Sequence, residues 1–110
     1  MATSEQTLND LQHLTALYRQ GHRSPVVDLA VEKLVTLERE HARHEADELD
    51  QKLKAYEQQY RLDSDDFYRR FRAGELGDDI EPVEWSIFYE MRAAVRQRLT
   101  VLESRATYDA

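Results

Sequence analysis

The residues best suited to metal chemistry stand close together near the middle of the chain. Glu38 and His41 have the Glu-x-x-His spacing of metal-binding helical bundles, and His44 would share a helix face with His41. Such a site also needs carboxylates and a second Glu-x-x-His pair from other helices, but neither His13 nor His22 has a glutamate three residues before it. We therefore expect a solvated polar stretch without a bound metal, and a metal-binding helical bundle is the least favoured alternative.

Nucleophilic catalysis has no recognisable basis in this sequence. There is no cysteine, no Gly-x-Ser-x-Gly turn that would expose a nucleophilic serine, and no glycine-rich loop that would hold a phosphate. Carboxylate pairs are frequent, but the chain has 22 acidic residues in 110, so such pairs do not point to a site. We expect a protein that is not an enzyme and carries no cofactor.

The segment 73–91 combines acidic and aromatic residues and contains no basic one. Rigid aromatic side chains surrounded by carboxylates suit a cationic protein surface. A structural explanation is also good, because acids near a helix start are favoured by the helix dipole and Trp85 could belong to the core. Phe88 and Met91 are expected in the core. The residues expected to contact a partner are Glu75, Asp78, Asp79, Glu84, Trp85 and Tyr89.

The overall charge narrows the class of partner. A net charge of −7 disfavours binding to nucleic acid, whose phosphates attract basic surfaces, and suits a basic protein instead. No run of 18 apolar residues occurs, so no membrane span is expected. The N-terminal residues lack the basic and apolar regions of a signal peptide. These features together predict a cytoplasmic protein.

Helical periodicity and helix-ending residues predict an all-α fold. Three Gly and two Pro are too few for a β-sandwich or barrel, which needs turn residues at short intervals. Thr3 and Gln6 have the spacing of a capping box, Gly21 suits a helix C-terminus, and Ser24-Pro25 suits the next helix start. The predicted helices cover about 3–20, 25–60, 63–73 and 82–104.

The third predicted helix has its own start and stop signals. Asp63 is expected to cap it, with Ser64 as the alternative, and Leu62 and Phe67 have the spacing of a hydrophobic staple. Acids open this helix and arginines close it, as the helix dipole favours. We expect these arginines, which are Arg69, Arg70 and Arg72, to pair within the chain rather than form a nucleic-acid patch.

The long second helix has an apolar seam whose two halves are out of phase. The first half contains Ala30, Leu34 and Leu37, and the second starts at Leu49, one residue away from the continued heptad. The helix is therefore expected to bend, change twist or break near 41–47. We expect one domain over 1–110, an elongated antiparallel hairpin or bundle with a frayed tail at 105–110. Such a thin hairpin covers its apolar residues incompletely, which favours an oligomer or a permanent partner.

The run from Asp63 to Asp79, followed by Glu84-Trp85 and Tyr89-Glu90, resembles a pattern in small all-helical prokaryotic proteins of toxin–antitoxin systems, most of them regarded as antitoxins. The front of the chain, around Gly21 and Pro25, is similar to some members, so the resemblance touches most of the chain but is specific only over 63–90. It implies a protein that occludes a basic toxin, with the acidic-aromatic segment as the contact. Many antitoxins also bind DNA, but no DNA-binding helix motif is present here. The alternative from a different class is a structural coiled-coil protein that forms homo-oligomers.

Overall fold

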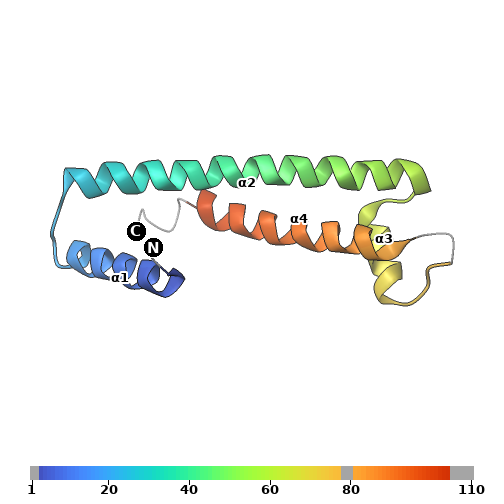
Figure 1. Cartoon of the computed structure of the whole chain (residues 1–110), viewed down its shortest axis with the longest axis horizontal. Coiled ribbons are helices and arrows are strands. Elements are labelled where there is room, and N and C mark those ends of the chain that lie inside the picture. Colours follow the sequence, from blue (N-terminus) through green and yellow to red (C-terminus); the bar gives the residue numbers. More distant parts are fainter. Residues whose placement is uncertain (1–2, 78–80, 105–110) are drawn as a thin grey trace. The chain divides into compact units, whose positions relative to one another are not determined.

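The computed structural model describes residues 3–77 and 81–104, and within these ranges the chain is helical and has no strand (Figure 1). The helices are α1 (Ser4–Arg19), α2 (Pro25–Tyr60), α3 (Ser64–Arg72) and α4 (Pro82–Glu103). The predicted all-α class and the four predicted helices are confirmed. Among the described residues, no helix is long and apolar enough to cross a membrane. The predicted frayed tail at 105–110 lies outside the described residues.

The chain divides into two compact units, Met1–Val35 and Thr36–Ala110. In the first unit, the predicted capping box is present, because the Thr3 hydroxyl accepts from the Gln6 amide at 3.1 Å and the Gln6 side chain accepts from the Thr3 amide at 2.8 Å. Gly21 follows α1 with a φ of 95°, the left-handed conformation in which glycine is least strained. α2 then begins at Pro25, as predicted.

The turn between α1 and α2 is held by one tyrosine. The Tyr18 hydroxyl donates to the Asp28 carboxylate at 2.6 Å and accepts from the Ser24 amide at 3.2 Å. Arg23 lies over the Tyr18 ring at 5.3 Å from its centroid. These contacts fix the turn, but no residue of α1 is buried.

α2 is one continuous helix of 36 residues and does not break near 41–47. Ala42 is fully buried, and from it the inward residues follow an unbroken heptad: Ala42, Ala46, Leu49, Leu53, Tyr56 and Tyr60. The mismatch between the two halves of the expected seam has no structural consequence, because the buried positions of α2 start only at Ala42. The earlier part of the expected seam, at Ala30, Leu34 and Leu37, is exposed instead.

The core of the second unit is built around Trp85 of α4. Its ring stacks on Phe67 of α3, with 3.8 Å between centroids, and on Tyr56 and Tyr60 of α2 at 5.4 and 5.7 Å. The indole nitrogen donates to the Ser64 hydroxyl at 3.0 Å, so the fully buried ring leaves no donor unpaired. Trp85 therefore joins three helices.

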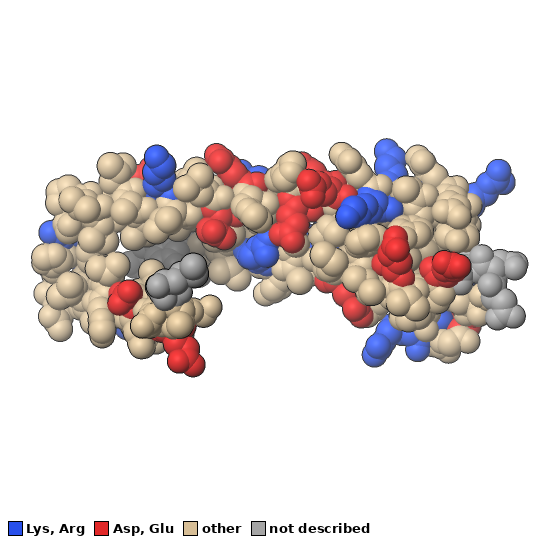
Figure 2. Space-filling model, in the orientation of Figure 1, with Lys and Arg blue, Asp and Glu red and all other residues tan. Residues whose placement is uncertain are grey.

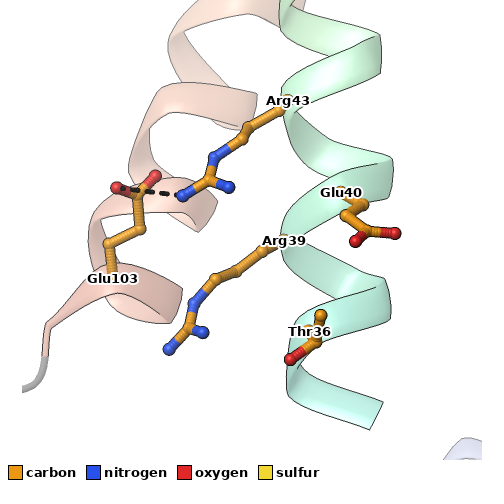
Figure 3. Close-up of a pocket in the computed structure, with 5 residues that line it drawn as sticks. All are labelled: Thr36, Arg39, Glu40, Arg43 and Glu103. Carbon is orange, nitrogen blue, oxygen red and sulfur yellow. Dashed lines mark ion pairs between the residues drawn. The ribbon is translucent and has the colours of Figure 1, made fainter. Parts of the chain in front are cut away.

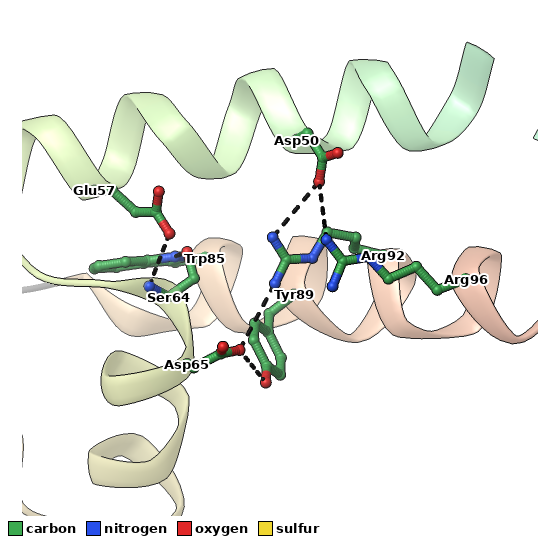
Figure 4. Close-up of polar contacts among 8 residues, drawn as sticks. All are labelled: Asp50, Glu57, Ser64, Asp65, Trp85, Tyr89, Arg92 and Arg96. Atoms are coloured by element: carbon green, nitrogen blue, oxygen red, sulfur yellow. Dashed lines mark hydrogen bonds and ion pairs between the residues drawn. The ribbon is translucent and has the colours of Figure 1, made fainter. Parts of the chain in front are cut away.

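The start of α3 is capped from another helix. Asp63 stands at the cap position, as predicted, but its side chain makes no capping hydrogen bond. Glu57 of α2 takes this role, since its carboxylate accepts from the Ser64 amide at 2.9 Å (Figure 4). Leu62 and Phe67 join the same apolar cluster, as the predicted staple requires.

The end of α4 is also stabilised from α2. α4 has no basic residue in its last turn. Instead the Arg39 guanidinium donates to the Leu102 carbonyl at 2.8 Å, and Arg43 lies 3.6 Å from the Glu103 carboxylate (Figure 3). Cations at a helix C-terminus complement its dipole and its free carbonyls. The hollow of about 250 Å³ beside these side chains is polar and is explained by this capping.

Replacing Trp85 with alanine should lower the free energy of unfolding by about 3–5 kcal/mol, the usual cost of removing a large buried aromatic side chain. The matched control is Ile87→Ala on the same helix, whose side chain is 47% exposed and whose loss should cost less than about 1 kcal/mol. Urea unfolding followed by circular dichroism measures both. Equal losses would contradict the central role of Trp85.

Candidate protein-binding surface

The residues expected to contact a partner differ in how exposed they are in the structure. Glu75 and Glu84 are exposed, and Tyr89 is half-buried. Trp85 is fully buried, so it is a core residue and not an exposed anchor. Asp78 and Asp79 lie outside the described residues. Of this segment, the described carboxylates Glu75 and Glu84 are thus accessible to a partner, whereas the Trp85 ring is not.

α4 exposes an apolar row that contains Val83 and Ile87, which the sequence analysis did not single out, and Met91, which it expected in the core. Val83, Ile87 and Met91 are 65, 47 and 42% exposed, so the expectation that Met91 is in the core is wrong. Their i, i+4, i+8 spacing puts them on one face at 100° per residue, away from Trp85. This spacing alone would have predicted a second apolar row on α4. The row that contains Trp85 and Phe88 is more apolar, and it is the one that the periodicity of the sequence predicts to face the core.

Two carboxylates flank this apolar stripe, and each is held by a tyrosine. The Tyr56 hydroxyl of α2 donates to Glu84, and the Tyr68 hydroxyl of α3 donates to Glu90 at 2.6 Å. We call the set Val83, Glu84, Ile87, Glu90 and Met91 the outward face of α4. Tyrosine hydroxyls are neutral, so these hydrogen bonds orient the carboxylates without cancelling their charge.

Several carboxylates elsewhere in the second unit are paired with cations, although others, such as Glu38 and Asp47 on α2, have no cation partner in the described chain. Arg92 lies 3.5 Å from Asp50 and 3.8 Å from Asp65, and Arg96 lies 3.8 Å from Asp50 (Figure 4). Glu45 pairs with Arg98. In the view of Figure 2, acidic side chains gather over the middle of α2 with basic side chains among them.

The carboxylates of the acidic segment have no such cations. Within residues 3–77 and 81–104, none of Glu75, Glu81, Glu84 and Glu90 is in an ion pair. Of the three α3 arginines, Arg69 pairs with Asp66 at 2.8 Å as expected. The expected pairing is not seen for the other two in this part of the chain. The negative charge of the segment is thus uncompensated where it borders the outward face of α4.

A hollow of about 480 Å³ adjoins this face between α2 and α4. Lys52 lies over the Phe88 ring at 4.7 Å from its centroid, and Tyr56 and Glu84 form another part of the lining. The hollow therefore borders Glu84 and contains one cationic side chain, that of Lys52, in its lining.

The residues considered for metal binding do not converge. Glu38, His41 and His44 are all exposed, and His44 lies 2.9 Å from Glu48 on the same helix. Across the ranges that the structure describes, no three or more His, Cys, Asp or Glu side chains are arranged to hold a metal ion. The polar stretch is a solvated face of α2.

Comparisons of this chain with protein-family models, with curated proteins and with solved structures find no match. No relative therefore supplies a function, and the resemblance to antitoxins stays a prediction.

Three hydrogen bonds raise tyrosine pKa values around α4. The Glu84 carboxylate, together with burial, raises the pKa of Tyr56 to about 12, because a hydroxyl that donates to an anion resists losing its proton. Glu90 and Asp65 raise the pKa of Tyr68 and Tyr89 in the same way. A raised pKa in the folded state stabilises the fold below the unfolded value near 10, and this stabilisation is lost as the pH rises towards about 12.

The variant Glu84→Gln should return the pKa of Tyr56 towards its ordinary value of 10.0, because the anionic acceptor is lost. Ultraviolet titration of tyrosinate absorbance should then show one tyrosine ionising earlier than in the unchanged protein. Glu75→Gln removes an exposed carboxylate that accepts no tyrosine hydrogen bond in the described structure, and should leave the titration as it was. Identical curves for all three proteins would refute the Tyr56–Glu84 hydrogen bond.

Proposed function

We propose that this chain is a protein-binding module that masks the basic surface of a protein partner, in the manner of an antitoxin and its toxin. The observation that carries the proposal is the outward face of α4, where exposed apolar side chains lie beside carboxylates without cation partners in the described chain. Val83 and Ile87 are not part of the core, and Glu84 and Glu90 accept hydrogen bonds from Tyr56 and Tyr68 but have no cation partner among the described residues.

The apolar row and the carboxylates beside it would contribute to binding in different ways. An apolar row at i, i+4 and i+8 is the pattern by which a helix lies in the groove of a partner. Uncompensated carboxylates around that row attract a basic surface and discriminate against an acidic one. The helix that presents them is held in place by Trp85 and Phe67, so little ordering is needed on binding.

The alternative function, a structural coiled-coil protein that forms homo-oligomers, is favoured by a separate observation. α1 has no buried residue, and on α2 the side chains of Leu34 and Leu37 are 58 and 50% exposed. These residues are distant in the sequence from the outward face of α4. Self-association and partner binding thus use different residues and are compatible.

The probe for partner binding is the purified product of the reading frame adjacent to this gene, titrated by calorimetry. Removing the two flanking charges in Glu84→Gln/Glu90→Gln should weaken binding by about tenfold, and Ile87→Ala should do so by a similar factor. The charge effect should shrink at high salt, because screening weakens steering and attraction between exposed charges.

The matched control is Glu38→Gln/Glu40→Gln, which removes the same charge from exposed positions on α2. It should leave the affinity within about twofold, because exposed charges away from an interface contribute little. Co-expression of the unchanged chain should also relieve growth inhibition by the adjacent product. Absence of binding, or equal losses in the test and control variants, would contradict the proposal.

A further inference from the structure

An acidic row and an apolar ridge cross at Ile87 on the exposed side of α4. Glu84, Ile87 and Glu90 are three residues apart and all are exposed. At 100° and 1.5 Å per residue, the two glutamates lie about 60° to either side of Ile87 and about 4.5 Å before and after it along the axis. Val83 and Met91, four residues from Ile87, lie about 40° to either side of it.

The two carboxylates of the acidic row are held by different neighbouring helices. The Tyr56 hydroxyl of α2 donates to Glu84, and the Tyr68 hydroxyl of α3 donates to Glu90 at 2.6 Å. Each of these hydrogen bonds uses one carboxylate oxygen and leaves the second for a cation. Within residues 3–77 and 81–104, neither carboxylate has a cation partner. Two oriented anions therefore stand on opposite sides of an exposed isoleucine.

This arrangement fits a helix that lies nearly along α4. Helices that cross at about 20° pack the i±3 row of one against the i±4 row of the other. The acidic row of α4 would then meet partner residues four before and four after the residue opposite Ile87. The apolar ridge would meet those three before and three after. This pattern is symmetric about its centre, so it is the same for a parallel and an antiparallel partner helix.

An extended basic segment fits the same face less well. Its side chains on one face repeat every two residues along a single line, whereas the acidic row and the apolar ridge of α4 run in different directions. A steeply crossing helix would also fit poorly, because Val83 and Met91 are separated by about 12 Å along the axis of α4. Only a nearly aligned helix reaches both ends of the apolar ridge and both carboxylates.

Building on the proposed function, we propose that the partner contacts α4 through an amphipathic helix with the pattern Arg-Leu-x-x-Leu-x-x-Leu-Arg. Here arginine stands for either long cation and leucine for any large apolar residue. The central leucine packs on Ile87, and the outer two pack on Val83 and Met91. The two cations pair with the free oxygens of Glu84 and Glu90.

The probe is a synthetic, fluorescently labelled, alanine-based helical peptide that contains this pattern. The full chain is titrated into it, and binding is followed by fluorescence anisotropy. The control peptide exchanges each arginine with the leucine beside it, which gives Leu-Arg-x-x-Leu-x-x-Arg-Leu. Its composition and charge are the same, but its outer leucines face the carboxylates. The first peptide should bind about tenfold more tightly than the control.

Glu84→Gln/Glu90→Gln should bring the affinities of the two peptides to within about twofold of each other, because the anions that distinguish them are gone. Glu38→Gln/Glu40→Gln removes the same charge from exposed positions on α2 and should keep the tenfold preference. Urea unfolding checks that both variants remain folded.

Equal binding of the two peptides by the unchanged chain would indicate attraction to basic charge without a helical match, and would overturn the inference. A preference that persists in Glu84→Gln/Glu90→Gln, or no binding of either peptide, would overturn it too. The product of the adjacent reading frame separates this from the proposed function. If that product binds in a way that depends on Glu84 and Glu90 while the peptides fail, the masking function stands and its helical occupant is wrong. If neither binds, both are contradicted.

Discussion

The burial of one tryptophan is the constraint on which the second unit depends. Trp85 can be fully buried only if both ring faces are covered and its indole N–H has an acceptor. Phe67, Tyr56 and Tyr60 stack on the ring, and the Ser64 hydroxyl is the acceptor. The same Ser64 is tied to Glu57, whose pKa is lowered because the hydrogen bonds from Ser64 outweigh the burial that raises it. With α2, α3 and α4 fixed in this way, the helix period leaves Val83 and Ile87 no inward position.

The two units are stabilised by different kinds of interaction. The second has buried clusters around Ala42, Leu49 and Val95 and around Trp85, together with ion pairs such as that of Arg92 with Asp50. The first has capped helices and a tyrosine-held turn, but no buried residue in α1. Caps and turns contribute about 1 kcal/mol each and set where helices begin and end, whereas apolar burial supplies most of the folding free energy. The first unit has the caps and the turn, so its helix ends are well defined, but the exposed leucines of α1 are not covered by apolar packing.

Local signals in the sequence were sufficient for the helices and insufficient for the surface. The Thr3–Gln6 box and Gly21 act within a few residues, so their structural roles follow from spacing alone. The cap of α3 could not be predicted, because Glu57 reaches Ser64 from another helix. The inward phase of α2 was also set by packing, since Ala42 matters only where α4 approaches closely. For α4, two apolar rows were present, and only the tertiary partners of Trp85 decide which row faces inward.

The unpaired acids of α4 separate into two groups by their place on the helix. Glu81 and Glu84 lie at the cap and in the first turn, where the helix dipole favours a negative charge by about 0.3–1 kcal/mol, so helix stability alone could account for them. Glu90 lies in the middle of α4, where the dipole effect is negligible, and three positively charged residues further along the helix pair with acids of α2 instead. Its hydrogen bond from Tyr68 fixes its direction but leaves its charge. Neither capping nor ion pairing within the described chain thus explains Glu90, and a cation on another protein would. Glu90 is consequently the residue of α4 whose charge the helix itself does not need and a basic partner would bind.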